Sequence, residues 1–131
     1  MISTKGRYAL RIMIDLAQHG DNRNIALKDI AERQHISKKY LEIIVRELVR
    51  NGMIEGTSGK GGGYRLCRSP EEYTAYEIIK VMEGTLAPVA CLEENAAPCP
   101  LAPGCHTLPL WKEYYQITYD FFSGKKLSDL L

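Results

Sequence analysis

The sequence predicts a mainly α-helical fold with a small β-hairpin wing: a winged helix-turn-helix followed by a long C-terminal dimerisation helix. Three observations carry this prediction. Residues 38–50 have the pattern of an amphipathic helix with a basic outer face. A Gly-rich, basic hairpin follows over residues 53–67, and residues 110–122 then form a helix that is apolar over an unusually wide arc.

The helix over residues 38–50 is the element on which the rest depends. Ser37 stands at its N-cap, where a hydroxyl can accept a hydrogen bond from a free N–H of the first turn. Its apolar residues recur at i, i+3, i+4 and i+7 and so share one face: they are Leu41, Ile44, Val45 and Leu48. The other face carries Lys39, Glu42, Ile43, Arg46 and Arg50. Asn51-Gly52 ends the helix.

The hairpin and the elements before the long helix complete a winged helix. Two short strands, over 53–58 and 64–67, bracket the turn Gly59-Lys60-Gly61-Gly62-Gly63. Ile25-Ala26-Leu27 is a candidate brief strand that pairs with this hairpin, and a short helix then runs to about Gln34. A surface helix or a Gly-rich turn alone is common in many folds. Their combination in this order is how a winged helix meets DNA.

Two further helices are expected around this unit. Thr4 is expected to cap a first helix that ends at His19, and Gly20-Asp21-Asn22 then forms a turn. The stretch Thr74-Ala75-Tyr76-Glu77 fits a capping box, so a helix should begin there and end at Gly84.

Residues 86–109 have no helical or strand period and hold five of the six prolines. A structureless stretch of this length is uncommon in a compact domain and is usually functional or disordered. Three of the four cysteines lie in it: Cys91, Cys99 and Cys105. In a reducing compartment they are not expected to form structural disulfides, and the paired C-x-x-C spacing of a zinc ribbon is absent. The fourth, Cys67, is expected to be a buried apolar residue on the second wing strand.

The C-terminal helix presents two adjacent apolar seams. The first consists of Leu110, Tyr114, Ile117 and Phe121, and the second of Trp111, Tyr115, Thr118 and Phe122. A single small domain supplies one cover, so a second copy of the chain is the natural other cover. The alternative is a helix buried entirely within its own chain. We therefore expect a homodimer.

Charge is uneven along the chain, although the formal total is only +1. Residues 1–68 carry 13 Lys/Arg against 7 Asp/Glu, whereas residues 69–131 carry 4 against 9. A basic first half suits a polyanion. Charged residues interrupt the only early apolar run, so no signal peptide is expected, and no stretch approaches the ~20 apolar residues of a membrane span. We expect a cytoplasmic protein with no membrane partner.

Taken together, these features resemble the Rrf2 family of bacterial transcriptional regulators. The resemblance lies in the opening Thr4-Lys5-Gly6-Arg7-Tyr8-Ala9, in Asp29-Ile30-Ala31, in Ile36-Ser37-x-x-Tyr40-Leu41-Glu42, in Gly61-Gly62-Gly63-Tyr64, in Glu83-Gly84 and in the three loop cysteines. It implies a dimeric regulator that binds an operator in double-stranded DNA, and not an enzyme. The expected division is a DNA-binding domain over 1–84, a sensor loop over 85–109 and a dimerisation helix with its tail over 110–131.

The resemblance also implies a cofactor. Many family members hold an iron–sulfur cluster, 2Fe–2S or 4Fe–4S, on the three loop cysteines, and thiolates in a Pro-rich loop suit such ligation. The fourth ligand departs from the family pattern. The cluster-regulating branch has a His three residues after the last cysteine, where this chain has Leu108. His106 is a possible fourth ligand, and a carboxylate such as Glu93 or Glu94, or a group from the other subunit, is an alternative.

The expected DNA contacts come from the long helix and the wing. Lys38, Lys39 and Arg46 would hold phosphates together with the helix N-terminus. Glu42 would accept from a cytosine amino group or reject a wrong base, and Lys60 would bring the wing to the backbone or the minor groove. The full predicted set is Ser37, Lys38, Lys39, Tyr40, Glu42, Arg46, Ser58, Lys60, Gly61, Gly62 and Tyr64.

Other functions remain open at this point. The chain could be a redox or metal-handling protein or an adaptor that acts through the cysteine loop, or a cluster-free Rrf2 regulator that senses a metabolite or a protein. No nucleophile–base pair with catalytic spacing is visible, and Gly59–Gly63 lacks the following Lys-Ser/Thr of a phosphate-binding loop. Salt-dependent binding to DNA would separate a regulator from the redox and adaptor alternatives.

Overall fold

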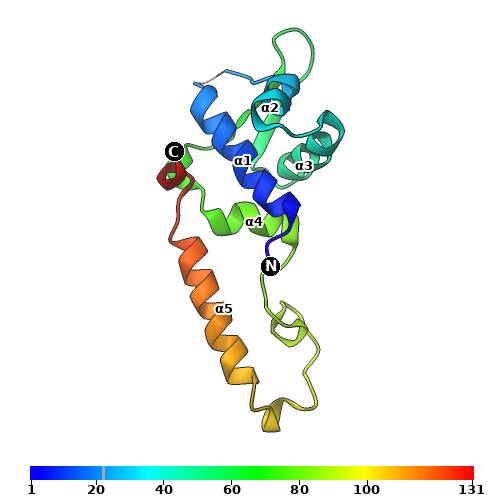
Figure 1. The fold of residues 1–131 in the computed structure, drawn as a ribbon, viewed down its shortest axis with the longest axis vertical. Coiled ribbons are helices and arrows are strands. Elements are labelled where there is room, and N and C mark those ends of the chain that lie inside the picture. The colour runs from blue at the N-terminus through cyan, green and yellow to red at the C-terminus, as the bar shows by residue number, and fades with distance from the viewer. Residues whose placement is uncertain (22) are drawn as a thin grey trace.

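The chain forms a helical body from which one long helix and one loop project in the same direction (Figure 1). The structure is a computed structural model that describes residues 1–21 and 23–131. The main elements are α1 (Thr4–His19), α2 (Leu27–Gln34), α3 (Lys38–Arg50), β1 (Ile54–Thr57), β2 (Gly63–Leu66), α4 (Ala75–Glu83) and α5 (Leu108–Ser123). Short 3-10 turns lie at Pro70–Glu72, Ala90–Leu92, Ala102–Gly104 and Leu127–Leu130. This architecture confirms the predicted winged helix-turn-helix with a long C-terminal helix.

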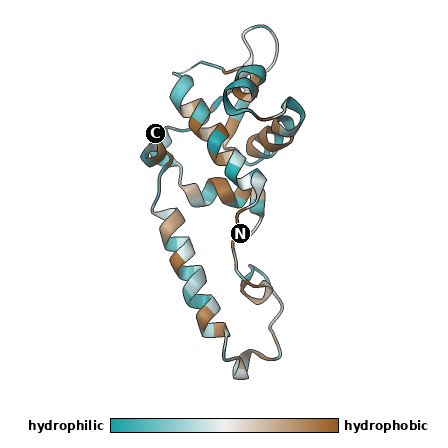
Figure 2. Ribbon diagram, in the orientation of Figure 1, coloured by the Kyte–Doolittle hydropathy of each residue, from teal (hydrophilic) through white to brown (hydrophobic). Residues whose placement is uncertain are grey.

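The core lies where α1 crosses α3 and α4. The apolar face predicted for α3 is buried throughout, and α1 contributes a matching row. Buried residues of the two helices are Ala9, Ile12, Met13, Leu16, Leu41, Ile44, Val45 and Leu48. Figure 2 shows apolar residues along α1, α3 and α4 in the body and also along α5, which projects from the body.

One charged residue belongs to this core and was not predicted. Asp15 is fully buried, and its carboxylate accepts hydrogen bonds from the Arg33 guanidinium at 2.7 and 3.0 Å. The Gln34 amide donates a third bond at 2.9 Å. These bonds tie α1 to the end of α2, which leads into α3. A buried carboxylate needs such partners because an unpaired charge is expensive to desolvate.

The start of α1 corrects one prediction. Ser3, not Thr4, is the N-cap, and its hydroxyl accepts from the backbone N–H of Gly6 at 3.2 Å. Ser3 also donates from its backbone N–H and its hydroxyl to the Glu83 carboxylate, at 2.9 and 2.5 Å. The contact between Ser3 and Glu83 brings the end of α4 against buried Gly6. This long-range contact favours Ser3 over Thr4 as the N-cap. Asn22, the last residue of the predicted turn after α1, lies outside the described residues.

The start of α3 confirms the predicted N-cap at Ser37. His35 has a left-handed backbone with φ 54°, and Ser37 accepts from the backbone N–H of Tyr40 at 3.2 Å. Ile25 pairs with Tyr64 through reciprocal backbone hydrogen bonds of 2.8 Å, so the brief strand predicted before α2 does join the hairpin.

The first strand of the hairpin is one residue shorter than predicted at each end, and the second begins and ends one residue earlier than predicted. β1 and β2 are antiparallel, with Ile54 opposite Leu66 and Thr57 opposite Gly63. Two glycines of the turn have no room for a side chain. A Cβ on Gly62 would collide with the carbonyl oxygen of Thr57, and one on Gly63, at φ 144°, would collide with the carbonyl of Ile25. Only glycine fits these positions, which explains the Gly-rich sequence of the wing.

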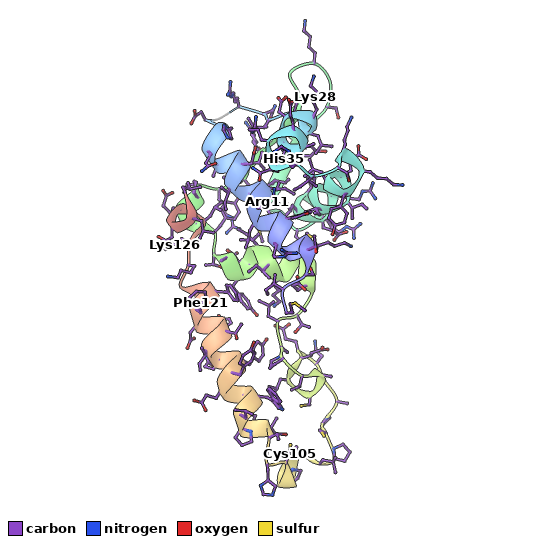
Figure 3. The ribbon with its side chains drawn as sticks, viewed as in Figure 1. Arg11, Lys28, His35, Cys105, Phe121 and Lys126 are labelled. Atoms are coloured by element: carbon purple, nitrogen blue, oxygen red, sulfur yellow. The ribbon has the colours of Figure 1, made fainter. Side chains whose placement is uncertain are left out.

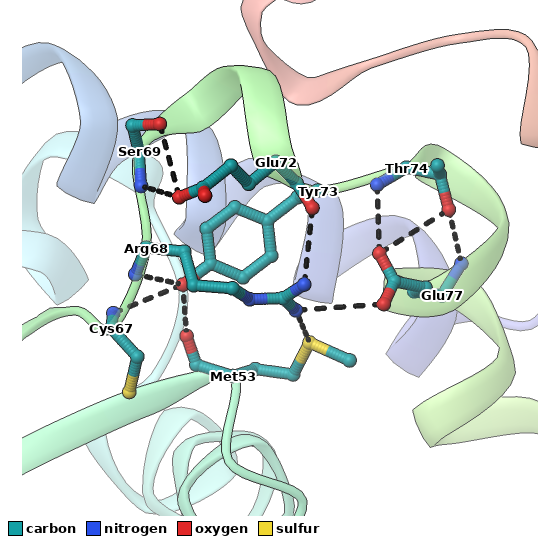
Figure 4. A network of polar contacts seen from close by, with 8 residues as sticks. All are labelled: Met53, Cys67, Arg68, Ser69, Glu72, Tyr73, Thr74 and Glu77. Atoms are coloured by element: carbon teal, nitrogen blue, oxygen red, sulfur yellow. Dashed lines mark hydrogen bonds and ion pairs between the residues drawn. The ribbon is translucent and has the colours of Figure 1, made fainter.

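A polar network joins the base of the wing to the start of α4 (Figure 4). The buried Tyr73 hydroxyl donates to the carbonyl of Met53 at 2.6 Å and accepts from the backbone N–H groups of Cys67 and Arg68, each at 3.0 Å. The Arg68 guanidinium lies 4.2 Å from the Tyr73 ring centroid and 3.5 Å from the Glu77 carboxylate. Thr74 and Glu77 form the predicted capping box of α4.

Cys67 corrects another prediction, because its side chain is exposed rather than buried. It directly follows Leu66, which packs against the core. Adjacent residues of an extended chain point to opposite faces, so an inward Leu66 sends Cys67 outward.

The C-terminal helix is longer than predicted, since it begins at Leu108 rather than Leu110. Pro109 lies in its first turn, where the missing N–H has no intrahelical partner in any case. After the last turn of α5, the chain returns to the body (Figure 1). The Leu127 backbone N–H donates to the backbone carbonyl of Tyr73 at 3.0 Å, and the Ala75 backbone N–H donates to the carbonyl of Lys125 at 2.8 Å. In the part of the chain that the structure describes, no helix is both long enough and apolar enough to cross a membrane.

Candidate DNA-binding surface and cysteine cavity

A groove runs between α3 and the hairpin, and we call it the recognition groove. Its volume is about 670 Å³. One side is lined by four residues of α3, which are Glu42, Val45, Arg46 and Val49. The other side is lined by the hairpin residues Gly56, Thr57, Ser58, Gly59, Gly62, Gly63 and Tyr64, and the groove is closed by Ala26 and Leu27. Of the predicted DNA contacts, the fold thus brings Glu42, Arg46, Ser58, Gly62 and Tyr64 together in one groove.

The basic side chains at this end of the molecule are free for an external anion. Lys38, Lys39, Arg46 and Lys60 are exposed, and within the described residues none has an ion-pair partner in the chain. Other arginines do have partners: Arg50 pairs with Glu47 and Arg65 with Glu55. Glu42 forms no ion pair with Arg46 in the described chain, so both side chains are available to a ligand.

The remaining predicted contacts divide into structural and exposed residues. Tyr40 is half-buried, and its ring stands edge-on to Tyr8 with centroids 5.7 Å apart. Ser37 caps α3, and Gly61 is exposed at the wing tip near Lys60. The structure adds Lys28 to the exposed cations at this end of the molecule. Lys28 lies at the start of α2, at the same end as the wing (Figure 3). Its position relative to the wing depends on tertiary packing, so no local pattern could have found it.

The three loop cysteines line one cavity, which we call the cysteine cavity. Its volume is about 240 Å³, and its other lining residues are Leu92, Pro98, Ala102, Leu108 and Lys112. It lies at the foot of α5, at the opposite end of the molecule from the wing, as the position of Cys105 in Figure 3 shows. Among the described residues, no three His, Cys, Asp or Glu side chains are close enough together to hold a metal ion directly.

The predicted candidates for a fourth ligand lie outside this cavity. His106 is exposed and does not line it, whereas Leu108, at the position where the family pattern has a His, does. Glu94 is engaged elsewhere, because its carboxylate accepts from Lys80 at 3.1 Å. Glu93 is exposed and does not line the cavity either.

Cys105 lies beside hydrogen-bond donors at the start of α5. Its sulfur lies 3.5 Å from the Thr107 hydroxyl, at the N-terminus of α5. Hydrogen bonds from that hydroxyl and from the backbone N–H groups of Thr107 and Leu108 lower the pKa of the Cys105 thiol. A lowered pKa raises the thiolate fraction, and the thiolate is the form that binds metals and reacts with oxidants.

A capped basic helix lies beside a glycine-rich antiparallel wing, and each carries cations that have no ion-pair partner within the described residues. This arrangement is that of a DNA-binding transcriptional regulator of the winged helix-turn-helix class. The chain belongs to the Rrf2 family: the family model, described as an iron-dependent transcriptional regulator, matches residues 2–131. The relatives found are regulators rather than enzymes.

Individual relatives cover nearly the whole chain. The protein Rrf2 of Nitratidesulfovibrio vulgaris is 38% identical over 130 residues, which are 99% of this chain and 86% of that protein. The structure of CymR, the global cysteine regulator of B. subtilis, has a TM-score of 0.80 at 36% identity and covers 99% of this chain and 95% of its own. That of T. potens IscR has a TM-score of 0.77 at 31% identity, with coverages of 99% and 85%.

Proposed function

We propose that this regulator binds a two-fold operator as a homodimer, and that the state of the cysteine cavity modulates its affinity for DNA. The single observation that supports this most is the path of the chain. The cysteine cavity lies at one end of α5, and the other end of that helix is hydrogen-bonded to the start of α4 in the body. On this proposal residues 1–84 bind DNA, 85–109 form the sensor and 110–131 form the dimer contact.

The two sides of α5 support the dimer. The seam of Trp111, Tyr115, Thr118 and Phe122 is half-buried against the chain itself. The other seam is open: Leu110, Tyr114, Ile117 and Phe121 are 58%, 56%, 62% and 57% exposed. An apolar stripe of this kind marks a protein interface. Two chains related by a two-fold would place their recognition helices on half-sites about one DNA turn apart.

Replacement of Arg46, which lines the recognition groove, or of Lys60, which is exposed at the wing tip, is expected to weaken DNA binding without changing sequence preference. Arg46→Ala and Lys60→Ala should each lower the salt dependence of binding by about one unit per lost phosphate contact. Binding isotherms at several salt concentrations would measure this slope. Arg65→Ala is the matched control, because Arg65 belongs to the same hairpin as Lys60 but already pairs with Glu55 within the chain. If Arg46→Ala and Lys60→Ala both left the slope unchanged, neither residue would belong to the DNA interface.

Glu42→Ala is expected to change which sequences are bound. Its carboxylate lines the recognition groove without a partner in the described chain, and each base contact of this kind is worth about 1–3 kcal/mol of discrimination. Selection from a randomised operator library would reveal relaxed preference at one position of each half-site. Glu47→Ala is the control, since Glu47 is on the same helix but pairs with Arg50. If Glu42→Ala selected the same sequences as the parent chain, Glu42 would have no base-reading role.

The cysteine cavity would hold a group through its three thiolates once the loop draws them together, since in the described residues they do not stand close enough to share a metal ion. Its donors are soft, they come from one loop, and the lowered pKa of Cys105 favours the ligating form. The family description as iron-dependent supports an iron–sulfur cluster held by Cys91, Cys99 and Cys105. Such a group would supply redox sensitivity at the foot of α5. A thiol sensor, or a cluster-free regulator that responds to a metabolite or protein, is the second candidate, supported by the likeness to CymR.

Anaerobic purification, with an absorption spectrum and an iron and sulfide count, tests the cluster. We expect coloured protein that loses its iron in Cys99→Ala and retains it in Cys67→Ala, since Cys67 is remote from the cavity. His106→Ala decides whether that residue moves in to act as the fourth ligand: loss of bound iron would assign it, and retention would assign the position to another group. Colourless protein without iron after reconstitution would refute the cluster and leave the thiol or metabolite alternatives.

A further inference from the structure

A second cavity lies on α5 above the cysteine cavity, and we call it the tyrosine cavity. Its volume is about 470 Å³, within the range of small-molecule sites. Tyr76 comes from α4, Leu92 and Glu94 from the loop, and Lys112, Tyr115, Gln116 and Tyr119 from α5. The cavity therefore joins the body, the loop and the projecting helix.

The tyrosine cavity faces away from the open apolar seam of α5. At 3.6 residues per turn, Lys112, Tyr115, Gln116 and Tyr119 centre on a direction about 180° from the direction of the seam. A second copy of the chain that covers the seam would consequently leave the cavity accessible to a small molecule.

Aromatic rings form most of its wall. The rings of Tyr76 and Tyr119 meet edge to face with centroids 4.8 Å apart. Burial, together with the neighbouring Tyr115 hydroxyl, raises the pKa of Tyr76 to about 12, so this hydroxyl stays protonated as a neutral donor near pH 7. Ring faces of this kind attract cations, and Lys80 already shows this, with its Nζ 5.8 Å from the Tyr76 centroid.

Two opposite charges stand at the same cavity. Lys112 has no ion-pair partner within the described residues. Glu94 binds Lys80 at 3.1 Å, but its side chain is 77% exposed, and exposed pairs of this type contribute little and exchange readily. A ligand ammonium can therefore take the place of Lys80 beside Glu94 and the Tyr76 ring, while a ligand carboxylate pairs with Lys112.

We propose that the tyrosine cavity binds a small zwitterionic amino acid with an apolar or aromatic side chain. The carboxylate pairs with Lys112, the ammonium with Glu94, and the side chain lies against Tyr76, Tyr115 and Tyr119. Leu92 and Lys112 line both this cavity and the cysteine cavity, so an occupant touches the residues that also shape the proposed sensor. The binding of the amino acid does not depend on the proposed function. An effect of that binding on DNA affinity does rest on the proposed function.

Isothermal titration calorimetry of the full chain, without DNA, tests the site with L-phenylalanine as the probe. Phenethylamine and 3-phenylpropionate each lack one of its charges and should bind about tenfold more weakly, because each forms one ion pair fewer with the protein. Lys112→Gln should weaken the binding of L-phenylalanine about tenfold but leave that of phenethylamine unchanged, because phenethylamine has no carboxylate. Glu94→Gln should likewise weaken the binding of L-phenylalanine about tenfold but leave that of 3-phenylpropionate unchanged, because 3-phenylpropionate has no ammonium group. Glu113→Gln is the matched control on the same helix, since Glu113 does not line the cavity.

Two results would overturn the proposal: no heat of binding for L-phenylalanine or L-leucine at millimolar concentration, or binding that Lys112→Gln and Glu94→Gln leave intact. The same titration on Cys99→Ala separates this site from the sensor. Binding retained there in a protein without iron would show that the two proposals stand independently.

Discussion

Ile117→Glu is expected to convert the protein from a dimer to a monomer and to reduce operator affinity by about 10²- to 10⁴-fold. Ile117 is the most exposed residue of the open seam and lies at its centre. In a dimer, an unpaired carboxylate at this position would lose its water against the apolar seam of the second chain, and that desolvation disfavours the dimer. The affinity falls so far because a dimer binds its second half-site at the high effective concentration set by the first.

Sedimentation velocity at micromolar concentration would measure the assembly, and titration of an operator fragment would measure the affinity. Phe121→Glu, at the body end of the same seam, should act in the same direction (Figure 3). Gln116→Glu is the matched control, because it adds the same charge to α5 on the side that faces away from the seam. A dimer that survives both seam variants would rule out this face as the interface.

Tyr73→Phe is expected to lower the free energy of unfolding by about 2–4 kcal/mol, although it removes a single oxygen atom. The hydroxyl bonds to three backbone groups, on Met53, Cys67 and Arg68, and the side chain is fully buried. Each buried group left without a partner costs about 1–3 kcal/mol. Water can reach part of this set because Cys67 is exposed, which keeps the expected loss below the full sum.

Urea denaturation would measure the loss, and amide hydrogen exchange would locate it. Exchange should accelerate first at Cys67 and Arg68, because their N–H groups lose the Tyr73 acceptor. Tyr8→Phe is the control: its ring contacts with Tyr40 and Arg11 do not need the hydroxyl, so the change should stay within about 0.5 kcal/mol. Equal stability of Tyr73→Phe and the parent chain would mean that water replaces the network completely.

The network also bears on function. It joins the base of the wing to the start of α4, and the backbone bonds of Ala75 and Leu127 join the same place to the end of α5. The wing and the projecting helix therefore meet at one polar junction around Tyr73. A movement of α5 would reach the recognition groove through this junction, which supports the coupling that we propose between the two ends of the molecule.

The sequence by itself determined the local elements of this protein. The cap at Ser37, the capping box of Thr74 and Glu77 and the Gly-rich wing follow from interactions within a few residues. Periodicity also identified the two seams of α5, since residues three and four apart share a helix face. Such features are legible because both partners of each interaction are neighbours in the chain.

Only the tertiary structure decided how distant parts meet. It selected Ser3 over Thr4 as a cap through Glu83, turned Cys67 outward, and placed the two seams of α5 in different environments. It also gathered three cysteines around one cavity and left His106 outside it. In each case the partners are far apart in sequence, or the choice depends on which face a neighbouring element covers. These contacts cannot be predicted from a local sequence pattern, because they form only when distant segments of the chain pack together.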